Sequence, residues 1–546
     1  MKQKKFALLM ASLMAASTVV MAVGCSGETI DSSSNDSRAS ITVATWDGGV
    51  GYAWLEQAAR EFEEIHKDAT NFEEGKVGVV INVDADRKYT GTGIENTTLD
   101  KDIYFTEGIN YYRLLNTGKI ADLTSIMTNP LEDGTKIIDK IEDNYADFLK
   151  TPEGKYYAIP FYDSFYSFAY DKTLWAQKGY YFDSTGEFTK DTTPTNLGVG
   201  PDGMTGVIDG IDYTMDDGLP ETYAQFNRLL EKMRRDSVKP FVWSEAGQEY
   251  LANYLYTHWA ANEGYEQMML NVNFQGKATT LVDIAADGTI TNLPATDISF
   301  KNGYMLQKQK GKYDALRFMG DILCATAENY EKRTNHIDAQ SAFVKNGIEQ
   351  DKPIGMIVEG SWWENEAEGA FTALANNDKQ RHDYGILPTP RVDENSAKGQ
   401  RTWLSLSSSY GFVSSSSKNK DLALEFMRYL HTNKQLSAFT AETHMTRALE
   451  YDVLEQDQAA LTTYAKSIID IKKNGKVIYP YSALDTVVNN DAMFTAYTWA
   501  WQTEIEGKDY KNPFLYFNQV DGGNPISYFN GLYTNFSSKW KDEWKK

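Results

Sequence analysis

Short apolar strands alternate with amphipathic helices in this chain, and that alternation constrains the fold more than any other feature. A β-branched run from Ile41 to Trp46 ends at Asp47-Gly48-Gly49, and residues 78–83 and 102–105 have the pattern of further strands. After the first strand, apolar residues recur at helical spacing: Leu55, Ala58, Ala59, Phe62 and Ile65. Strands that alternate with helices predict an α/β fold with parallel sheets, in which ligands bind beyond the carboxyl ends of the strands.

A second folding unit is predicted beyond Pro160. Thr222 and Gln225 have the spacing of a capping box, and an apolar helical stripe follows them: Phe226, Leu229, Leu230 and Met233. Asn419 is predicted to cap a later helix with its own stripe: Leu422, Phe426, Tyr429 and Leu430. Residues 184–218 are rich in Gly, Asp and Thr, which indicates a loop or hairpin insertion. Because the chain has 546 residues, we expect two lobes rather than one domain.

The N-terminus has the pattern of an export signal, in which three lysines precede an uncharged apolar run over residues 6–23. The run is nearly long enough to span a bilayer as an uncleaved anchor. Its ending, Ala22-Val23-Gly24-Cys25, instead resembles a bacterial lipobox. This resemblance implies a signal peptide over residues 1–24, lipidation of Cys25, and a small polar tether over residues 25–40.

The composition favours a neutral ligand and argues against several classes of partner. The net charge of −22 disfavours nucleic acid and electrostatic docking on anionic lipid. The 34 Tyr and 12 Trp suit saccharides, because pyranose rings present apolar C–H faces to flat aromatic side chains. The six His and two Cys form no cluster with metal-ligand spacing, so we expect no metal site and no cofactor.

Seven segments, in order along the chain, resemble the extracellular solute-binding proteins of sugar ABC transporters, the family that includes maltose-binding protein. They are residues 41–64, 102–126, 154–175, 219–234, 352–367, 384–394 and 410–439. Among them, GKYYAIP (154–160) is similar to the family's Gly-Lys-x-Tyr-x-x-Pro crossover, and Asp171 replaces the Asn of its Tyr-Asn-Lys helix start. The chain is longer than is usual for this family, with apparent insertions at 180–218 and 270–305.

The resemblance implies a two-lobed periplasmic-binding-protein-like fold, with a ligand cleft between the lobes and hinge crossovers near residues 160–164 and 401–407. The implied N-terminal lobe comprises residues 41–162 and 405–450, and the implied C-terminal lobe comprises residues 163–404 and 451–546. The resemblance also implies a monomeric receptor, not an enzyme, that is anchored by lipid to the outer face of the cell membrane. Such a receptor delivers an oligosaccharide to the permease subunits of an ABC importer.

Candidate ligand-binding residues lie at strand ends and crossovers. Trp46 and Asp47 follow the first strand and Glu107 follows the third, where a carboxylate would accept hydrogen bonds from sugar hydroxyls. The resemblance implies that Trp362 is an aromatic platform, and the adjacent Trp363 must then point elsewhere. The remaining candidates lie near the expected crossovers, after the capped helix or toward the C-terminus: Tyr162, Asp163, Tyr166, Trp243, Trp403, Tyr410 and Tyr481.

Other interpretations remain open at this level. A glycoside hydrolase would need two carboxylates that flank a glycosidic bond, and this acidic chain offers many carboxylates without a motif that pairs two of them. A surface sensor or adhesin for glycans would share the fold without serving a transporter. Core packing is the competing explanation for the aromatic candidates, Trp363 and Tyr481 among them.

Overall fold

The computed structural model describes most of the chain that follows the predicted tether. The described residues are 37–91, 93–200, 203–208, 211–246, 248–345, 353–393, 396, 401–406, 408–484, 499, 501–519 and 523–543. The predicted signal peptide, Cys25 and tether residues 26–36 lie outside these ranges. None of the helices within them combines the length and the apolar content that a membrane crossing requires.

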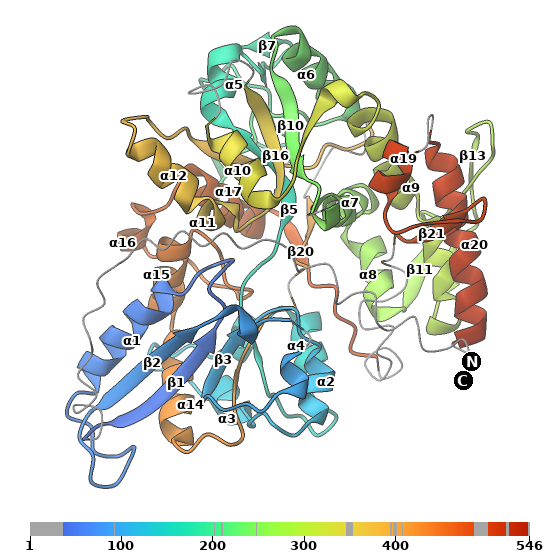
Figure 1. Ribbon diagram of the computed structural model, residues 1–546. Coiled ribbons are helices and arrows are strands. Elements are labelled where there is room, and N and C mark those ends of the chain that lie inside the picture. The colour runs from blue at the N-terminus through green and yellow to red at the C-terminus, as the bar shows by residue number, and fades with distance from the viewer. Residues whose placement is uncertain are drawn as a thin grey trace.

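The first sheet has the strand order β2-β1-β3-β19-β4, and Figure 1 shows its strands β1, β2 and β3 side by side. Its strands are β1 (Ala39–Thr45), β2 (Val79–Ala85), β3 (Ile103–Thr106), β4 (Ile159–Pro160) and β19 (Tyr410–Val413). β1 runs parallel to β2 and β3, and β19 is antiparallel to β3 and β4. Ala39 already pairs with Val79, so ordered structure begins inside the predicted tether.

The apolar pattern explains which faces of this first lobe are buried. In α1 (Ala53–Ile65) the predicted stripe is buried together with Trp54, except that Ile65 at the helix end is exposed. α1 packs on β2, and α14 (Lys420–Leu430) packs on β1 and β19. α15 (Asn433–Thr443) packs on α1 and thereby completes the helical layer.

The second sheet has the strand order β15-β10-β16-β5-β17. Its strands are β5 (Tyr166–Asp171), β10 (Lys239–Ser244), β15 (Tyr330–Arg333), β16 (Ile354–Gly360) and β17 (Tyr384–Leu387). β10 is parallel to β15 and β16, whereas β5 is antiparallel to β16 and β17. The predicted mixture of parallel strands and helices is therefore confirmed in two separate sheets, as an α/β fold with two lobes (Figure 1).

Helices cover this second sheet, and the one predicted from the sequence begins as expected. The helix α6 (Tyr223–Arg235) begins with a complete capping box between Thr222 and Gln225, and its apolar stripe is buried. α7 (Gln248–Glu263) packs on β5 and β16, α10 (His336–Val344) on β10 and β16, and α17 (Thr463–Asn474) on β17. The other α-helices of the described chain are α2 (Tyr111–Asn116), α3 (Thr124–Thr128), α4 (Asp143–Leu149), α5 (Lys172–Lys178), α8 (Tyr265–Asn273), α9 (Lys310–Arg317), α11 (Trp363–Glu366), α12 (Glu368–Ala375), α16 (Glu455–Gln458), α19 (Pro513–Gln519) and α20 (Pro525–Glu543).

The two predicted insertions fold as small hairpins. In the first, β6 (Tyr181–Phe182) pairs with β7 (Phe188–Thr189), and β8 (Val207–Ile208) pairs with β9 (Ile211–Asp212). In the second, β11 (Gly276–Ala278) pairs with β14 (Thr296–Ile298), and β12 (Val282–Ile284) pairs with β13 (Ile290–Asn292).

The second insertion shares a small apolar core with the C-terminal helix α20. This core includes Phe274, Ala278, Ile298 and Trp540. Figure 1 shows α20 lying beside β11, β13 and β21 on one side of the second lobe. Two further strand pairs complete the described fold: β18 (Thr402–Leu404) with β20 (Lys476–Ile478), and β21 (Thr503–Ile505) with β22 (Lys508–Tyr510).

Candidate ligand-binding site between the two sheets

The chain passes directly from the edge of one sheet to the edge of the other. β4 ends at Pro160 beside Tyr410, and β5 begins at Tyr166 beside Gly360. Residues 161–165 join the two strands, so the two edges lie within about 20 Å of each other. The parallel strands β1 and β3 end at the first edge, and β10 and β16 end at the second. Side chains that follow these strands therefore face the region between the lobes, as in other α/β sheets that bind ligands.

A tryptophan lies over a glycine at each of these edges. After β1, the ring of Trp46 lies so close to Gly48 that an added Cβ would fall 2.5 Å from it. After β16, an added Cβ on Gly360 would fall 2.3 Å from the ring of Trp362. Trp46 is half-buried, Asp47 is exposed and Trp362 is 9% exposed. Because glycine has no side chain, each indole ring can lie against the backbone at the end of its strand.

Trp362 belongs to a group of three rings, which we call the interlobe aromatic cluster: Tyr166, Tyr250 and Trp362. The rings of Tyr166 and Trp362 meet edge to face with centroids 5.3 Å apart. The Tyr250 ring, from α7, lies 5.9 Å from Tyr166 and 6.1 Å from Trp362. Both tyrosines are half-buried, so the cluster keeps aromatic surface exposed beside a buried indole.

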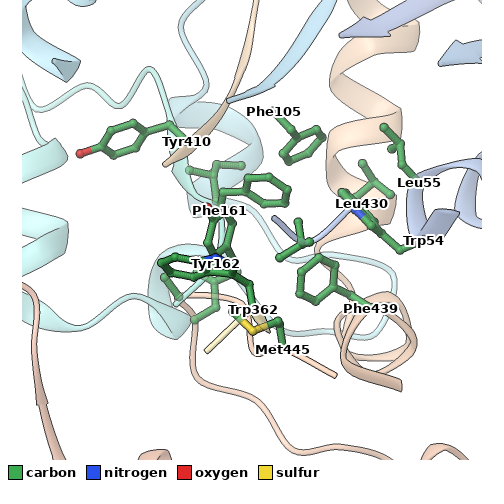
Figure 2. Packing of buried hydrophobic residues seen from close by; sticks show 14 of the residues in the cluster. Trp54, Leu55, Phe105, Phe161, Tyr162, Trp362, Tyr410, Leu430, Phe439 and Met445 are labelled. Atoms are coloured by element: carbon green, nitrogen blue, oxygen red, sulfur yellow. The ribbon is translucent and has the colours of Figure 1, made fainter. Parts of the chain in front are cut away.

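Tyr162 and Glu107 extend the site toward the first lobe. The Tyr162 hydroxyl donates a hydrogen bond to Glu107 Oε2, and it lies 3.7 Å from where a Cβ on Gly49 would be. Figure 2 shows Tyr162 and Trp362 together at the margin of the apolar core that contains Trp54, Phe105, Phe161 and Phe439. Apolar packing is therefore continuous between the lobes at this point.

Two carboxyl groups, one from each lobe, interact electrostatically. Glu107 follows β3 in the first lobe, and Glu366 ends α11 in the second. Burial, with a smaller contribution from the negative charge of Glu366, raises the pKa of Glu107 to about 8. Burial also raises the pKa of Glu366 to about 7, against the opposing effect of hydrogen bonds from Gln340 and Trp362. Both side chains are half-exposed, so they remain accessible to a ligand.

Asp163 is a component of the hinge rather than a ligand contact. It is fully buried at the first crossover, where Lys472 lies 3.0 Å away and the hydroxyls of Tyr479 and Thr446 donate hydrogen bonds of 2.8 and 2.7 Å. Lys472 also donates to the carbonyl oxygens of Arg447 and Leu449. The prediction that Asp163 contacts the ligand is therefore corrected: its carboxylate is saturated by the segments that join the lobes.

The second predicted crossover runs beside the first. Leu406 donates a backbone hydrogen bond to Ser164, and Ser405 donates one to Ile478. Trp403 precedes this crossover in β18 and is buried against Phe165. It lines a small cavity of about 30 Å³, which has room for water but not for a saccharide.

Four further aromatic candidates lie in the cores of the lobes. Trp363 is 0% exposed and packs on Phe343, Phe371, Tyr384 and Tyr464. Trp243 is buried against Phe514 of α19, with ring centroids 4.0 Å apart. Tyr410 packs on Tyr111, and Tyr481 stacks on Tyr145 at 4.8 Å. Aromatic residues are so frequent in this chain that their positions near expected crossovers did not distinguish core from site.

Three residues of the site were not predicted from the sequence. Tyr250 lies in the first turn of α7, Gln340 lies in the interior of α10, and Glu366 is one of three glutamates within five residues. No motif marks any of them. The only available signal was that the three helices follow β10, β15 and β16 in the chain. The carboxyl ends of these strands form one edge of the candidate site, so residues early in the following helices can reach it.

Comparisons with known proteins identify the fold. No protein-family model and no curated protein sequence matches the chain. Among solved structures, SBP RafE in complex with raffinose aligns with a TM-score of 0.51 and 13% identity, over 91% of this chain and 99% of that one. The apo form of RafE from Streptococcus pneumoniae aligns with a TM-score of 0.52 and 14% identity, over 92% and 98% of the two chains. The unliganded or acarbose-bound GacH receptor of Streptomyces glaucescens aligns with a TM-score of 0.52 and 12% identity, over 92% and 99%. The chain thus has the two-lobed fold of these binding proteins, and the resemblance found in its sequence is confirmed at the level of the fold.

Proposed function

We propose that this protein is the extracellular substrate-binding component of an ABC importer and that it captures an oligosaccharide between its lobes. The observation that carries the proposal is the interlobe site itself. Half-buried Trp46, Tyr166 and Tyr250 and the carboxyl groups of Glu107 and Glu366 lie where strands of both sheets end. Flat apolar rings beside hydrogen-bonding groups match the two faces of a pyranose. The fold shared with RafE and GacH, over more than nine-tenths of this chain, supports the same function.

The mechanism is closure of the lobes around the ligand. Trp46 and Glu107 belong to the first lobe, whereas Tyr166, Tyr250 and Trp362 belong to the second. A saccharide that contacts both sets stabilises the closed arrangement relative to the open one, by the difference in its affinity for the two. The permease then binds the closed, loaded form preferentially. In this scheme the lobes comprise residues 41–162 with 405–450 and residues 163–404 with 451–546, and the crossovers act as the hinge.

The N-terminal segment fits this role. Residues 1–24 would direct export, and a lipid on Cys25 would hold the monomeric receptor at the outer face of the cell membrane. A Cys25→Ala variant is expected to lose lipid labelling and to accumulate in the medium or as an unprocessed precursor. Labelling of this variant at the level of the original chain would refute the lipobox.

Calorimetric titration tests the binding function. The chain from Ser26 onward contains every described residue, and it would be titrated with neutral oligosaccharides that differ in length and linkage. We expect micromolar or tighter affinity for one series, with no product formed over hours of incubation. Turnover of a bound oligosaccharide would identify a glycoside hydrolase instead. A folded protein that binds none of the series would rule out the oligosaccharide.

A further inference from the structure

The interlobe site contains more hydrogen-bond acceptors than donors. Gln340 of α10 donates through Nε2 to Glu366 Oε2 at 3.1 Å and to Glu359 Oε1 at 3.3 Å. Glu107 faces the same region from the first lobe and accepts a hydrogen bond from Tyr162. Two carboxyl groups, from β16 and α11, thus accept hydrogen bonds from one amide group, and a third follows β3 in the first lobe.

A buried acceptor in this group has no partner. Gln340 is 1% exposed, and its Oε1 atom forms no hydrogen bond to any described residue. A buried unpaired carbonyl oxygen is unfavourable, and a donor supplied by a ligand would relieve it. Because neutral hydroxyl groups donate once and also accept, a group with several donors and no acceptor fits this environment better.

Within the described residues, no lysine or arginine would balance the charge of these carboxyl groups once they ionise. Within the part of the chain that the structure describes, neither Glu107 nor Glu366 forms an ion pair with lysine or arginine. The charge of Glu366 affects the ionisation of Glu107, and hydrogen bonds from Gln340 and Trp362 affect that of Glu366. By contrast, Glu364, on the same helix as Glu366, pairs with Arg381 and accepts a hydrogen bond from Thr462. Glu366 therefore lacks the counter-charge that its neighbour has.

We propose that Glu107 and Glu366 bind a protonated amino group, so that the ligand is an amino-bearing saccharide held with its –NH₃⁺ between the lobes. An ammonium group donates three hydrogen bonds and accepts none, which matches the surplus of acceptors. The neighbouring indole and phenol rings favour an organic cation, because aromatic faces attract positive charge. A metal ion is a poorer fit, since the described residues contain no group of three or more His, Cys, Asp or Glu that would hold one. The inference rests on the proposed function, whose saccharide it specifies.

Among the described residues, Gln340 donates to Glu366 and to Glu359, and Tyr162 donates to Glu107. At pH 6 the raised pKa values of about 8 and about 7 leave Glu107 and Glu366 protonated in the empty protein. A bound ammonium group favours the ionised carboxylates and expels protons. At that pH an aliphatic amine is itself protonated, so the protons released come from the protein.

The test compares matched saccharides. The chain from Ser26 onward would be titrated with neutral β-linked and α-linked oligosaccharides, with their 2-amino-2-deoxy counterparts and with the N-acetylated forms of these. We expect the free amine to bind at least tenfold more tightly than its neutral and N-acetylated counterparts. Titrations at pH 6 in buffers of different ionisation enthalpy should show release of at least half a proton with the amine and none with the neutral sugar.

Variants assign the preference to the two carboxyl groups. Glu107→Gln and Glu366→Gln should each lower the ratio of amine to neutral affinity at least fivefold. Glu368→Gln, an exposed position two residues away in α12 that loses the same charge, should leave the ratio unchanged. Binding of the neutral series without preference for the amine would overturn this inference and leave the proposed function intact. Absence of binding to every saccharide would overturn both, and a preference that survives in both glutamine variants would remove the assignment to these residues.

Discussion

Two groups of ionisable side chains lie near the crossovers, and they differ in how their charge is compensated. At the hinge, Asp163 pairs with Lys472 at 3.0 Å and accepts hydrogen bonds from Tyr479 and Thr446. Between the lobes, the charge of Glu366 acts on Glu107, and no lysine or arginine of the described ranges pairs with either. The hinge group is complete within the protein, whereas the interlobe group lacks a positive charge.

This difference separates residues that hold the lobes together from residues that we propose bind a ligand. A buried charge is tolerated when an opposite charge and hydrogen bonds surround it, and removal of one partner is then costly. A buried charge without such partners destabilises the empty protein, and perturbed carboxyl groups of this kind concentrate at functional sites. Substitutions at the two groups should therefore have opposite effects on stability.

The largest effect is expected at the hinge. Lys472→Met removes the cation and leaves the Asp163 carboxylate buried without its counter-charge, so the free energy of unfolding should fall by about 3–5 kcal/mol. Urea denaturation would measure it. Lys473→Met is the control, because Lys473 is the next residue of α17 and its ion pair with Asp452 is exposed; it should cost less than about 1 kcal/mol. If both variants cost the same, Asp163 and Lys472 do not fix the hinge.

At the interlobe carboxyl groups we expect the opposite effect: loss of the ionisable group should raise the free energy of unfolding at high pH. The pKa of Glu107, about 8, lies above that of a carboxyl group in the unfolded chain, 4.5. Between these values the native protein binds more protons than the unfolded chain, so its stability falls as the pH rises. One pKa unit corresponds to about 1.4 kcal/mol, and partial exposure reduces the total, so we expect a loss of about 2 kcal/mol between pH 5 and pH 8.5.

Glu107→Gln should remove most of this dependence and make the empty protein more stable than the original chain at pH 8.5. Urea denaturation at the two pH values would measure the difference, and Glu368→Gln would control for the loss of one negative charge at an exposed position. If the Glu107→Gln variant is less stable than the original chain at pH 8.5, then Glu107 stabilises the fold, as Asp163 does, and the contrast between the two groups is wrong.

The sequence predicted the helices and strands well because each of them depends mainly on the pattern of residues within its own segment. Thr222 and Gln225 form the capping box that their spacing indicated. The helix after Asn419 begins where predicted, but the Asn419 side chain donates to the Ser40 carbonyl and to Glu73 instead of capping the helix. A local signal therefore located the helix start, and a tertiary contact decided what the side chain does.

The site was predicted less completely because it depends on which face of each element meets the other lobe. The adjacent Trp362 and Trp363 were expected to diverge, and they do: the first lies in the interlobe aromatic cluster and the second in the core. The same logic could not separate Glu364 from Glu366, because α11 is one turn long and its orientation is set by packing. Residues from helices, such as Tyr250 and Gln340, come together only through the arrangement of the second sheet.

The smallest expected effect concerns the position of one ring. A Cβ on Gly360 would lie 2.3 Å from the Trp362 ring, so Gly360→Ala must displace that ring from the end of β16. Trp362 would then lose its edge-to-face contact with Tyr166. Affinity for the tightest-binding oligosaccharide should fall about tenfold, or about 1.4 kcal/mol. Calorimetric titration would measure it.

Gly369→Ala in α12 is the matched control, because a Cβ there meets no atom within 4 Å. Alanine is favoured over glycine in a helix by about 1 kcal/mol, so this variant should be slightly more stable and should bind the ligand normally. If Gly360→Ala lowers stability as much as Lys472→Met does while affinity is retained, then Trp362 acts as a packing residue of the lobe contact. The ligand-facing group would then be limited to Glu107, Glu366 and the half-buried tyrosines, and the contrast with the hinge would rest on charge alone.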